Sequence, residues 1–114
     1  MKKAVVFGGS GFIGSHVSDY LTKVGYQVTI YDTKESQWLL EGQKMVIGNI
    51  DNIEKINQTI AEAEVVYNFA ALADLNEAIK EPIKTIKINI LGNLNVMEAC
   101  CKHRIVPQQI KTTI

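Results

Sequence analysis

A cluster of glycines near the start of the chain constrains the fold more than any other feature of the sequence. Gly8, Gly11 and Gly14 lie three residues apart, directly after the apolar run of residues 4–7. A continuously apolar run of this length is typical of a strand that is buried on both faces of a parallel sheet. Apolar residues then recur every three or four positions over residues 13–24, which predicts a helix. The sequence therefore predicts a strand, a glycine-rich turn and a helix in succession.

This glycine-rich turn has the spacing of a site that holds a diphosphate. The first glycine permits a tight turn, the second lets a ligand approach the backbone, and the third lets the helix pack closely. The N–H groups of the first helical turn lack partners within the helix, and the helix dipole adds partial positive charge there. Phosphate oxygens accept hydrogen bonds from such groups, so the N–H groups of Phe12 and Ile13 are our candidate donors. The turn does not end in the Gly-Lys-Ser/Thr of an ATP-binding P-loop.

Strand and helix patterns alternate along the rest of the chain. Short runs rich in β-branched and aromatic residues predict strands over residues 27–31, 45–47 and 65–69. Apolar residues at helical spacing predict helices over residues 53–63 and 82–103. This alternation predicts an α/β fold, a Rossmann-like doubly wound parallel sheet. Because the remaining tail shows no periodicity, we expect the sheet to be truncated after about four strands.

Length and composition fit one globular domain or part of one. The chain has 114 residues, and its twelve Lys and Arg balance twelve Asp and Glu, so no basic excess points to nucleic acid. No apolar run approaches the roughly 18 residues that a membrane helix needs, and the run after Lys3 is too short for a secretory signal. Cys100 and Cys101 lack metal-ligand spacing and fit a reducing compartment. We therefore expect a cytoplasmic protein without a metal, nucleic-acid or membrane partner.

An acidic residue, Asp32, ends the second expected strand. In a βαβ unit with a glycine-rich turn, an acid at this place accepts hydrogen bonds from the adenosine ribose. Its negative charge repels a 2′-phosphate, which favours NAD over NADP, and the nearby Lys34 would soften that preference. The alternative for Asp32 is a turn residue that merely stops the strand.

Residues 8–16, Gly-Gly-Ser-Gly-Phe-Ile-Gly-Ser-His, closely resemble the opening of the extended short-chain dehydrogenase/reductases. These include the NAD-dependent sugar-nucleotide epimerases and dehydratases. The likeness continues at Asp32, where the family places its ribose-binding acid, and it covers about residues 1–104 with five motifs in order. It implies NAD as the cofactor and, in the complete protein, a nucleotide-sugar substrate.

Three further motifs extend this resemblance toward other parts of the cofactor. Gly48-Asn49-Ile50 resembles a Gly-Asp-Ile/Leu motif that contacts adenine, with Asn49 in place of Asp. Residues 65–71 resemble a strand that ends in His-Leu-Ala-Ala beside the diphosphate and nicotinamide ribose, with Asn68 where His is common. Residues 89–93 resemble the helix motif Asn-x-x-Gly-Thr, with Asn93 replacing Thr. The expected cofactor-binding residues are thus Gly8, Gly11, Phe12, Ile13, Gly14, Asp32, Asn49, Ile50, Phe69, Ala70, Ala71 and Asn89.

The catalytic pair of this family is missing from the sequence. The family uses a Ser/Thr and a Tyr-x-x-x-Lys pair, in which the lysine lowers the pKa of the tyrosine. Four positions after the four tyrosines stand Val24, Ile30, Glu35 and Ala71, and none of these is lysine. We therefore expect no catalytic residue here, and we interpret residues 1–114 as a partial NAD(P)-binding Rossmann domain without the substrate domain and the catalytic half. The alternatives are a non-catalytic dinucleotide-binding module and a nonfunctional truncated fragment.

An apolar stripe runs along the expected helix of residues 82–103, either as core or as an interface. The resemblance implies the second, because in this family the helix often packs against its copy in a partner subunit, and so a homodimer is possible. Truncation would also leave the fourth strand as an apolar edge, and we expect poor solubility or self-association from it. The stripe consists of Ile83, Ile86, Ile90, Leu94, Met97 and Cys101.

Overall fold

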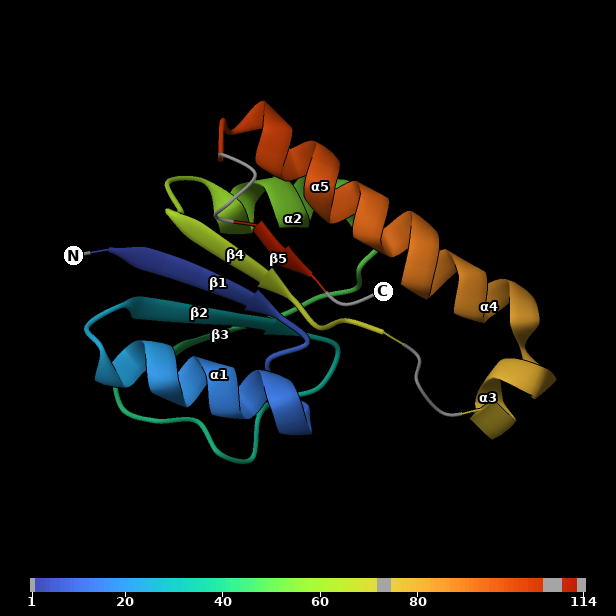
Figure 1. Ribbon diagram of the computed structural model, residues 1–114, viewed down its shortest axis with the longest axis horizontal. Helices are drawn as coiled ribbons and strands as arrows, with labels where there is room; N and C mark the ends of the chain where they lie inside the picture. Colours follow the sequence, from blue (N-terminus) through green and yellow to red (C-terminus); the bar gives the residue numbers. More distant parts are fainter. Residues whose placement is uncertain (1, 72–74, 106–109, 113–114) are drawn as a thin grey trace.

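The computed structural model describes residues 2–71, 75–105 and 110–112, and its strands and helices alternate along the chain (Figure 1). The strands are β1 (Lys3–Phe7), β2 (Gln27–Asp32), β3 (Lys44–Ile47), β4 (Val65–Asn68) and β5 (Ile110–Thr112). The helices are α1 (Phe12–Lys23), α2 (Ile53–Ile60), α3 (Leu75–Lys80), α4 (Pro82–Ile86) and α5 (Asn93–Lys102), with the π-helical segment η1 (Lys87–Gly92) between the last two.

The five strands form one parallel sheet in the order β3-β2-β1-β4-β5. The chain first builds outward from β1 to β3 and then returns to the other side of β1 to place β4. Helix α1 covers one face of the sheet, and α2 and α5 cover the other (Figure 1). The predicted Rossmann-like doubly wound fold is confirmed, and it has a topological switch point between β1 and β4.

The sheet has one strand more than the sequence predicted. β5 pairs with β4 in parallel, with Val66 opposite Ile110 and Asn68 opposite Thr112. A three-residue strand is too short to show a side-chain period, and only its main-chain pairing identifies it. β4 is therefore an interior strand, so the prediction that it forms an exposed edge is wrong. Residues 106–109, which belong to the tail without periodicity, lie outside the described part of the chain.

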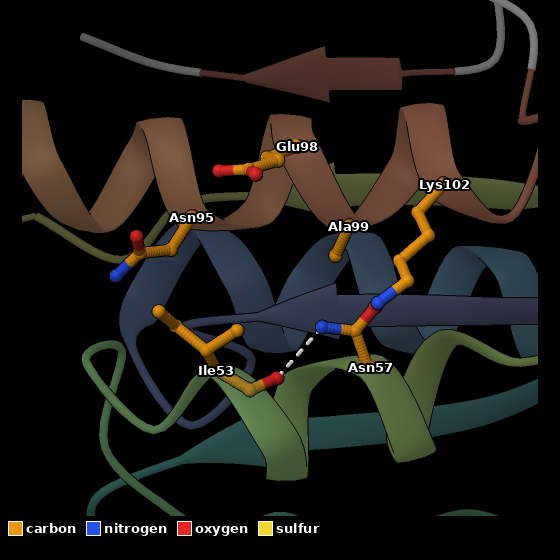
Figure 2. Close-up of a pocket in the computed structure, with 6 residues that line it drawn as sticks. All are labelled: Ile53, Asn57, Asn95, Glu98, Ala99 and Lys102. Atoms are coloured by element: carbon orange, nitrogen blue, oxygen red, sulfur yellow. Dashed lines mark hydrogen bonds between the residues drawn. The ribbon is translucent and has the colours of Figure 1, made fainter.

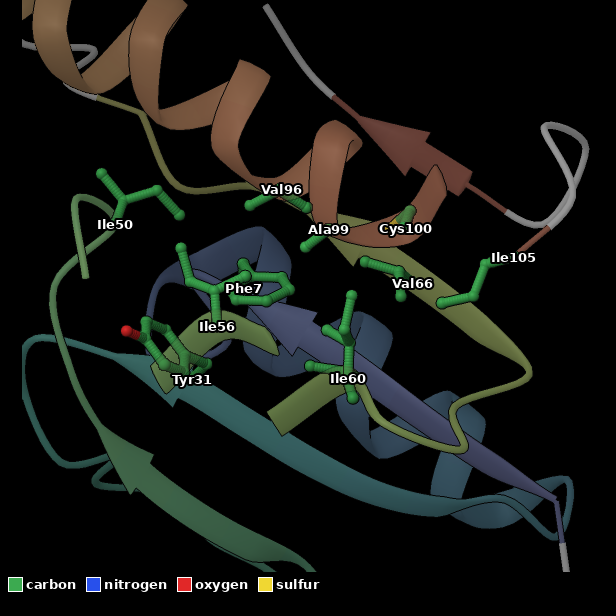
Figure 3. Close-up of a cluster of buried hydrophobic side chains, with 11 residues drawn as sticks. Phe7, Tyr31, Ile50, Ile56, Ile60, Val66, Val96, Ala99, Cys100 and Ile105 are labelled. Atoms are coloured by element: carbon green, nitrogen blue, oxygen red, sulfur yellow. The ribbon is translucent and has the colours of Figure 1, made fainter. Parts of the chain in front are cut away.

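Two apolar layers hold the helices on the sheet. The layer under α2 and α5 is built from Phe7, Tyr31 and Val66 of the strands, against Ile56 and Ile60 of α2 and neighbouring residues of α5 (Figure 3). The aromatic rings of Phe7 and Tyr31 lie 4.9 Å apart within this layer. The smaller layer under α1 joins alternate strand residues such as Ala4, Val6, Val28 and Ile30 to Leu21. Strands buried on both faces explain why their sequences are continuously apolar.

The buried side of α1 differs from the predicted stripe. Among the apolar residues at helical spacing over residues 13–24, Leu21 is buried, whereas Ile13 and Val24 are exposed. The small residues Gly14, Ser15 and Ser18 face inward instead. Small side chains let a helix approach the sheet closely, and Ser18 satisfies its own hydroxyl by donating to the carbonyl oxygen of Gly14 over 2.7 Å.

The predicted helix of residues 82–103 begins at Pro82 as expected, but the wider π-helical turn η1 interrupts it. Its apolar stripe faces solvent, and Ile83 is 70% exposed. The side that packs on the sheet carries smaller residues, among them Gly92, Ala99 and Cys100. Gly92 lies so close to Ile50 that a Cβ there would approach its Cγ2 to 2.6 Å. The interpretation of the stripe as core is therefore wrong, and the interface interpretation stays a prediction.

Candidate functional site

Four segments that the sequence predicted to bind a cofactor meet at the carboxyl edge of the sheet (Figure 1). Gly8 follows β1, and Asp32 ends β2. Asn49 comes two residues after β3, and Phe69 directly follows β4. Ligands of open α/β sheets bind beyond the carboxyl ends of the strands, at the switch point. The sheet order thus brings these residues to the place where a ligand is expected.

The three glycines of the turn between β1 and α1 have different structural roles. Gly8 has a φ of +75°, and a Cβ there would lie 2.7 Å from the main-chain nitrogen of Ala70. A Cβ on Gly14 would lie only 2.1 Å from the carbonyl oxygen of Gly8, so the third glycine is needed for close packing. A Cβ on Gly11 would make only an ordinary contact of 3.4 Å with the same oxygen. The first and third glycines therefore serve the fold, and the second keeps the backbone accessible.

The N-terminus of α1 carries no side-chain cap. Gly11 is its N-cap residue, and the first turn contains no acidic residue. The side chains of Phe12 and Ile13 are exposed and lie clear of the core. The hydroxyl of Ser15 donates to the carbonyl oxygen of Phe12 over 2.9 Å and does not cap the N–H groups of this turn. These N–H groups and the helix dipole suit an anion such as a phosphate.

Asp32 turns its carboxylate toward the glycine-rich turn. Its Oδ2 accepts a hydrogen bond from the N–H of Ser10 over 3.0 Å, and its Oδ1 accepts one from the N–H of Thr33 over 2.7 Å. The Ser10 hydroxyl also donates to the carbonyl oxygen of Lys34 over 2.7 Å, which ties the turn to the end of β2. The Thr33 hydroxyl also donates to Oδ1 over 3.4 Å, so Oδ2 is the oxygen with a further lone pair that can accept from a hydroxyl group of a ligand.

The two predicted adenine-binding residues occupy different environments. Asn49 is exposed, and its carbonyl oxygen accepts a hydrogen bond from the Tyr31 hydroxyl over 2.6 Å. Burial, and secondly the charge of Asp51, raise the pKa of Tyr31, so this phenol stays protonated and keeps donating. Ile50 is buried and its side chain lies in the core (Figure 3). Only the main chain of Ile50 is therefore left to face a ligand.

The segment after β4 lies against the glycine-rich turn. The N–H of Phe69 donates to the carbonyl oxygen of Phe7 over 2.8 Å, and the N–H of Ala70 donates to Oδ1 of Asn68 over 3.0 Å. The Phe69 ring is half-buried in the layer under α1, whereas Ala71 is exposed. The remaining predicted residue, Asn89, is half-buried in η1. The structure thus lines both sides of the switch point with predicted residues.

The sequence did not predict two side-chain hydrogen bonds that join α5 to the end of β4 and to the segment after β3. Asn68 and Asn93 are hydrogen-bonded to each other, and Asn95 donates to the carbonyl oxygen of Ile50 over 3.1 Å. A signal for the first tie was present, because both partners replace the family's usual residues. Nothing in the local pattern around Asn95 pointed to the second.

A small pocket lies between α2 and α5, and it is not part of this site (Figure 2). Its volume of about 60 Å³ is far below what a dinucleotide needs. Over the described ranges 2–71, 75–105 and 110–112, no cluster of His, Cys, Asp and Glu could hold a metal ion, and no helix could cross a membrane. The pocket is lined by Ile53, Asn57, Asn95, Glu98, Ala99 and Lys102.

Comparison with known families agrees with this geometry. The model of the NAD dependent epimerase/dehydratase family matches residues 4–112 of the chain. The chain belongs to this family. Among its relatives, a UDP-glucuronic acid decarboxylase 1 of Danio rerio is 32% identical over 104 residues, which cover 84% of this chain and 24% of that protein. A putative UDP-glucose 4-epimerase of Methanocaldococcus jannaschii is 35% identical over 107 residues, which cover 89% of this chain and 34% of that protein.

Solved structures of family members have the same fold. A UDP-glucose 4-epimerase from Brucella ovis in complex with NAD superposes with a TM-score of 0.82 at 29% identity, over 92% of this chain and 34% of that one. The Thermotoga maritima UDP-glucose 4-epimerase with UDP-glucose gives a TM-score of 0.84 at 31% identity, over 90% of this chain and 35% of that one. The chain thus spans between about a quarter and a third of the length of the curated relatives described above.

Proposed function

We propose that this chain binds NAD at the carboxyl edge of its sheet and forms the NAD-binding portion of a sugar-nucleotide epimerase or dehydratase. The observation that carries the proposal is the uncapped N-terminus of α1 beside the carboxylate of Asp32. A dinucleotide needs a diphosphate site and a ribose site close together, and these two groups provide them. Two family members of the same fold are named as complexes with NAD, from Brucella ovis and Thermus thermophilus.

Each part of the cofactor has its own residues in this proposal. The N–H groups of Phe12 and Ile13 bind the diphosphate, which approaches across Gly11. Asp32 accepts from the adenosine ribose, and the segment of Asn49 and Ile50 lies against adenine. The nicotinamide ribose lies near residues 69–71, together with Asn89. The remaining glycines, 8 and 14, shape the turn.

A titration of the purified chain with NAD and NADP tests this proposal. We expect NAD to bind and to raise the melting temperature, and NADP to bind more weakly because Asp32 repels the 2′-phosphate. Asp32→Asn keeps the shape of the side chain and removes its charge. This variant should lose about tenfold in NAD affinity and most of the preference over NADP. Equal, undetectable binding of both dinucleotides by the unmodified chain would refute the proposal.

The complete protein acts on a nucleotide sugar in this proposal, and the chain described here is not catalytic alone. None of its four tyrosines is followed by lysine at the fourth position. A phenol with an ordinary pKa near 10 is a poor acid–base group at neutral pH without a cationic neighbour. We expect no NAD-dependent turnover of UDP-glucose by the 114-residue chain. If NAD binds without turnover, the chain acts as a dinucleotide-binding module; if NAD does not bind either, it is a nonfunctional fragment.

We propose two further properties, the location of the chain and its dimerisation. The free thiols of Cys100 and Cys101 suit the reducing cytoplasm, which we propose as the location. The exposed stripe of α4, η1 and α5 is proposed to pack against the same stripe of a second copy, because it includes Ile83, Ile90 and Leu94, each at least half exposed. Ile83→Lys combined with Ile90→Lys should convert a dimer into a monomer in sedimentation. A wild-type chain that stays monomeric at high concentration would refute the dimer.

A further inference from the structure

Two buried asparagines join the end of β4 to the start of α5. Asn68 is 1% exposed and Asn93 is 6% exposed. The Nδ2 group of Asn68 donates to Oδ1 of Asn93 over 3.0 Å. The Oδ1 atom of Asn68 accepts from the main-chain N–H of Ala70, also over 3.0 Å. One amide group therefore binds the helix on one side and the segment after the strand on the other.

The hydrogen bonds of this pair fix the orientation of both amide groups. Because the N–H of Ala70 occupies the oxygen of Asn68, the nitrogen of Asn68 must face α5, where it needs an acceptor. Asn93 supplies that acceptor, and its own Nδ2 lies 3.8 Å from the sulfur of Met97. If position 93 offered no acceptor, the buried N–H donor of Asn68 would lose this hydrogen bond. Because a buried donor without its acceptor is costly, the segments around Asn68 would rearrange.

Such a rearrangement would shift Ala70, which lies beside the glycine-rich turn. The main-chain nitrogen of Ala70 lies so near Gly8 that a Cβ there would approach it to 2.7 Å. The residue before it, Phe69, is held by its N–H bond to the carbonyl oxygen of Phe7. The segment is thus fixed between Gly8 on one side and the Asn68 amide on the other. It therefore lies on the β4 side of the switch point, against the turn that leads from β1 into α1.

We propose that Asn93 is a positioning residue that acts through Asn68 to hold residues 69–71 against the glycine-rich turn. It thereby sets the diphosphate and nicotinamide half of the dinucleotide site. The inference rests on the proposed NAD binding. In this proposal Asn93 acts by supplying the acceptor that orients Asn68.

The same helix provides an internal comparison two residues further on. Asn95 donates its Nδ2 to the carbonyl oxygen of Ile50 over 3.1 Å. Its tie reaches the segment after β3, which belongs to the adenine half of the proposed site. Asn93 and Asn95 therefore make similar bonds from the same helix to opposite halves of the site, and their loss should change the affinities for NAD and AMP in different patterns.

The test measures the affinity of the 114-residue chain for NAD and for AMP, which carries only the adenine, the ribose and one phosphate. Asn93→Leu has a similar volume but no acceptor, and it should weaken NAD about tenfold while AMP stays within twofold. Asn93→Asp keeps an acceptor oxygen in either protonation state and should retain most of the NAD affinity. Asn95→Leu should weaken AMP and NAD by the same factor.

Circular dichroism and urea unfolding establish that each variant is folded under the binding conditions. If Asn93→Leu does not fold, Asn93→Ser replaces it, because the shorter side chain withdraws the acceptor without adding bulk. Unchanged NAD affinity in this variant, or an equal loss for NAD and AMP, would overturn the inference. Failure of the unmodified chain to bind either ligand would refute the proposed function instead, so the two failures are distinguishable.

Discussion

The two sides of the switch point are shaped by different means. On the β1 side, the turn depends on missing side chains, since a Cβ on Gly8 or Gly14 would collide with the backbone. On the β4 side, the segment depends on side chains that are present, Asn68 and Asn93, which bridge strand and helix. Steric exclusion tolerates no substitution, whereas a hydrogen-bonded pair can be replaced by another pair with matching donors and acceptors. This difference fits the sequence, where the glycine motif is intact and both asparagines replace the family's usual residues.

We expect the largest loss of stability from a substitution at Gly14. If stability did not fall, the steric explanation of the β1 side would be wrong. Gly14→Ala places a Cβ 2.1 Å from the carbonyl oxygen of Gly8, so α1 must move away from the turn. We expect a loss of about 3 kcal/mol or more in the free energy of unfolding, measured by urea denaturation.

Gly11→Ala is the matched control on the same turn. Its new Cβ makes only a 3.4 Å contact, and its φ of −78° suits any residue. The free energy of unfolding should change by less than about 1 kcal/mol. NAD affinity should still fall, because the methyl group stands where the diphosphate approaches. If Gly11→Ala is as unstable as Gly14→Ala, the claim that Gly14 serves packing and Gly11 serves ligand access is wrong.

We expect an intermediate loss of stability from a substitution at Tyr31. This side chain of β2 also holds a neighbouring segment, the one that follows β3, by a hydrogen bond. Tyr31→Phe removes the hydroxyl that donates to the carbonyl oxygen of Asn49 over 2.6 Å. The unfolding free energy should fall by about 1 kcal/mol, because the ring keeps its packing against Phe7. AMP affinity should weaken by two- to threefold in a calorimetric titration. An unchanged stability would show that the segment after β3 does not depend on this bond, and that side-chain ties matter only on the β4 side.

The smallest effect concerns the two neighbouring thiols of α5. Burial, and secondly the charge of Cys101, raise the pKa of Cys100 to about 11, whereas Cys101 is exposed. At pH 8 only about one in a thousand Cys100 thiols is ionised, so a thiol reagent should label Cys101 alone in the folded chain. Because the folded pKa lies above the ordinary value of 9.0, stability should be unaffected below pH 9 and should decline as the pH rises from there toward 11. Fast labelling of both thiols at neutral pH would show that α5 is not firmly packed on the sheet.

The sequence predicted the elements that local patterns control. The glycine spacing, the apolar run before it and the acid at position 32 predicted the βαβ start, and the structure confirms the order β1, α1, β2. Helix limits were also readable where a local residue sets them. Pro82 begins α4 where the sequence predicted, whereas α2 begins at Ile53 as predicted but ends at Ile60, three residues before the predicted limit.

The sequence failed where the outcome depended on contacts between distant segments. It could not show which side of α5 packs on the sheet, because Ala99 and Cys100 are buried there while the larger Leu94 and Met97 face outward. It could not show that the side chain of Ile50 packs in the core against Gly92, which leaves only its main chain for the predicted ligand contact. It also left out β5, whose existence depends on main-chain pairing with β4.

By itself, then, the sequence determined β1 to β4, the helices α1 and α2 and the turn that can hold a diphosphate, because these depend on residues within a few positions of one another. Only the tertiary structure decided that Asn68 and Asn93, 25 residues apart, share one hydrogen bond. The physical reason is that a buried amide has no partner until the helix docks on the strand. Side-chain contacts across the fold are set by packing, and no local pattern encodes them.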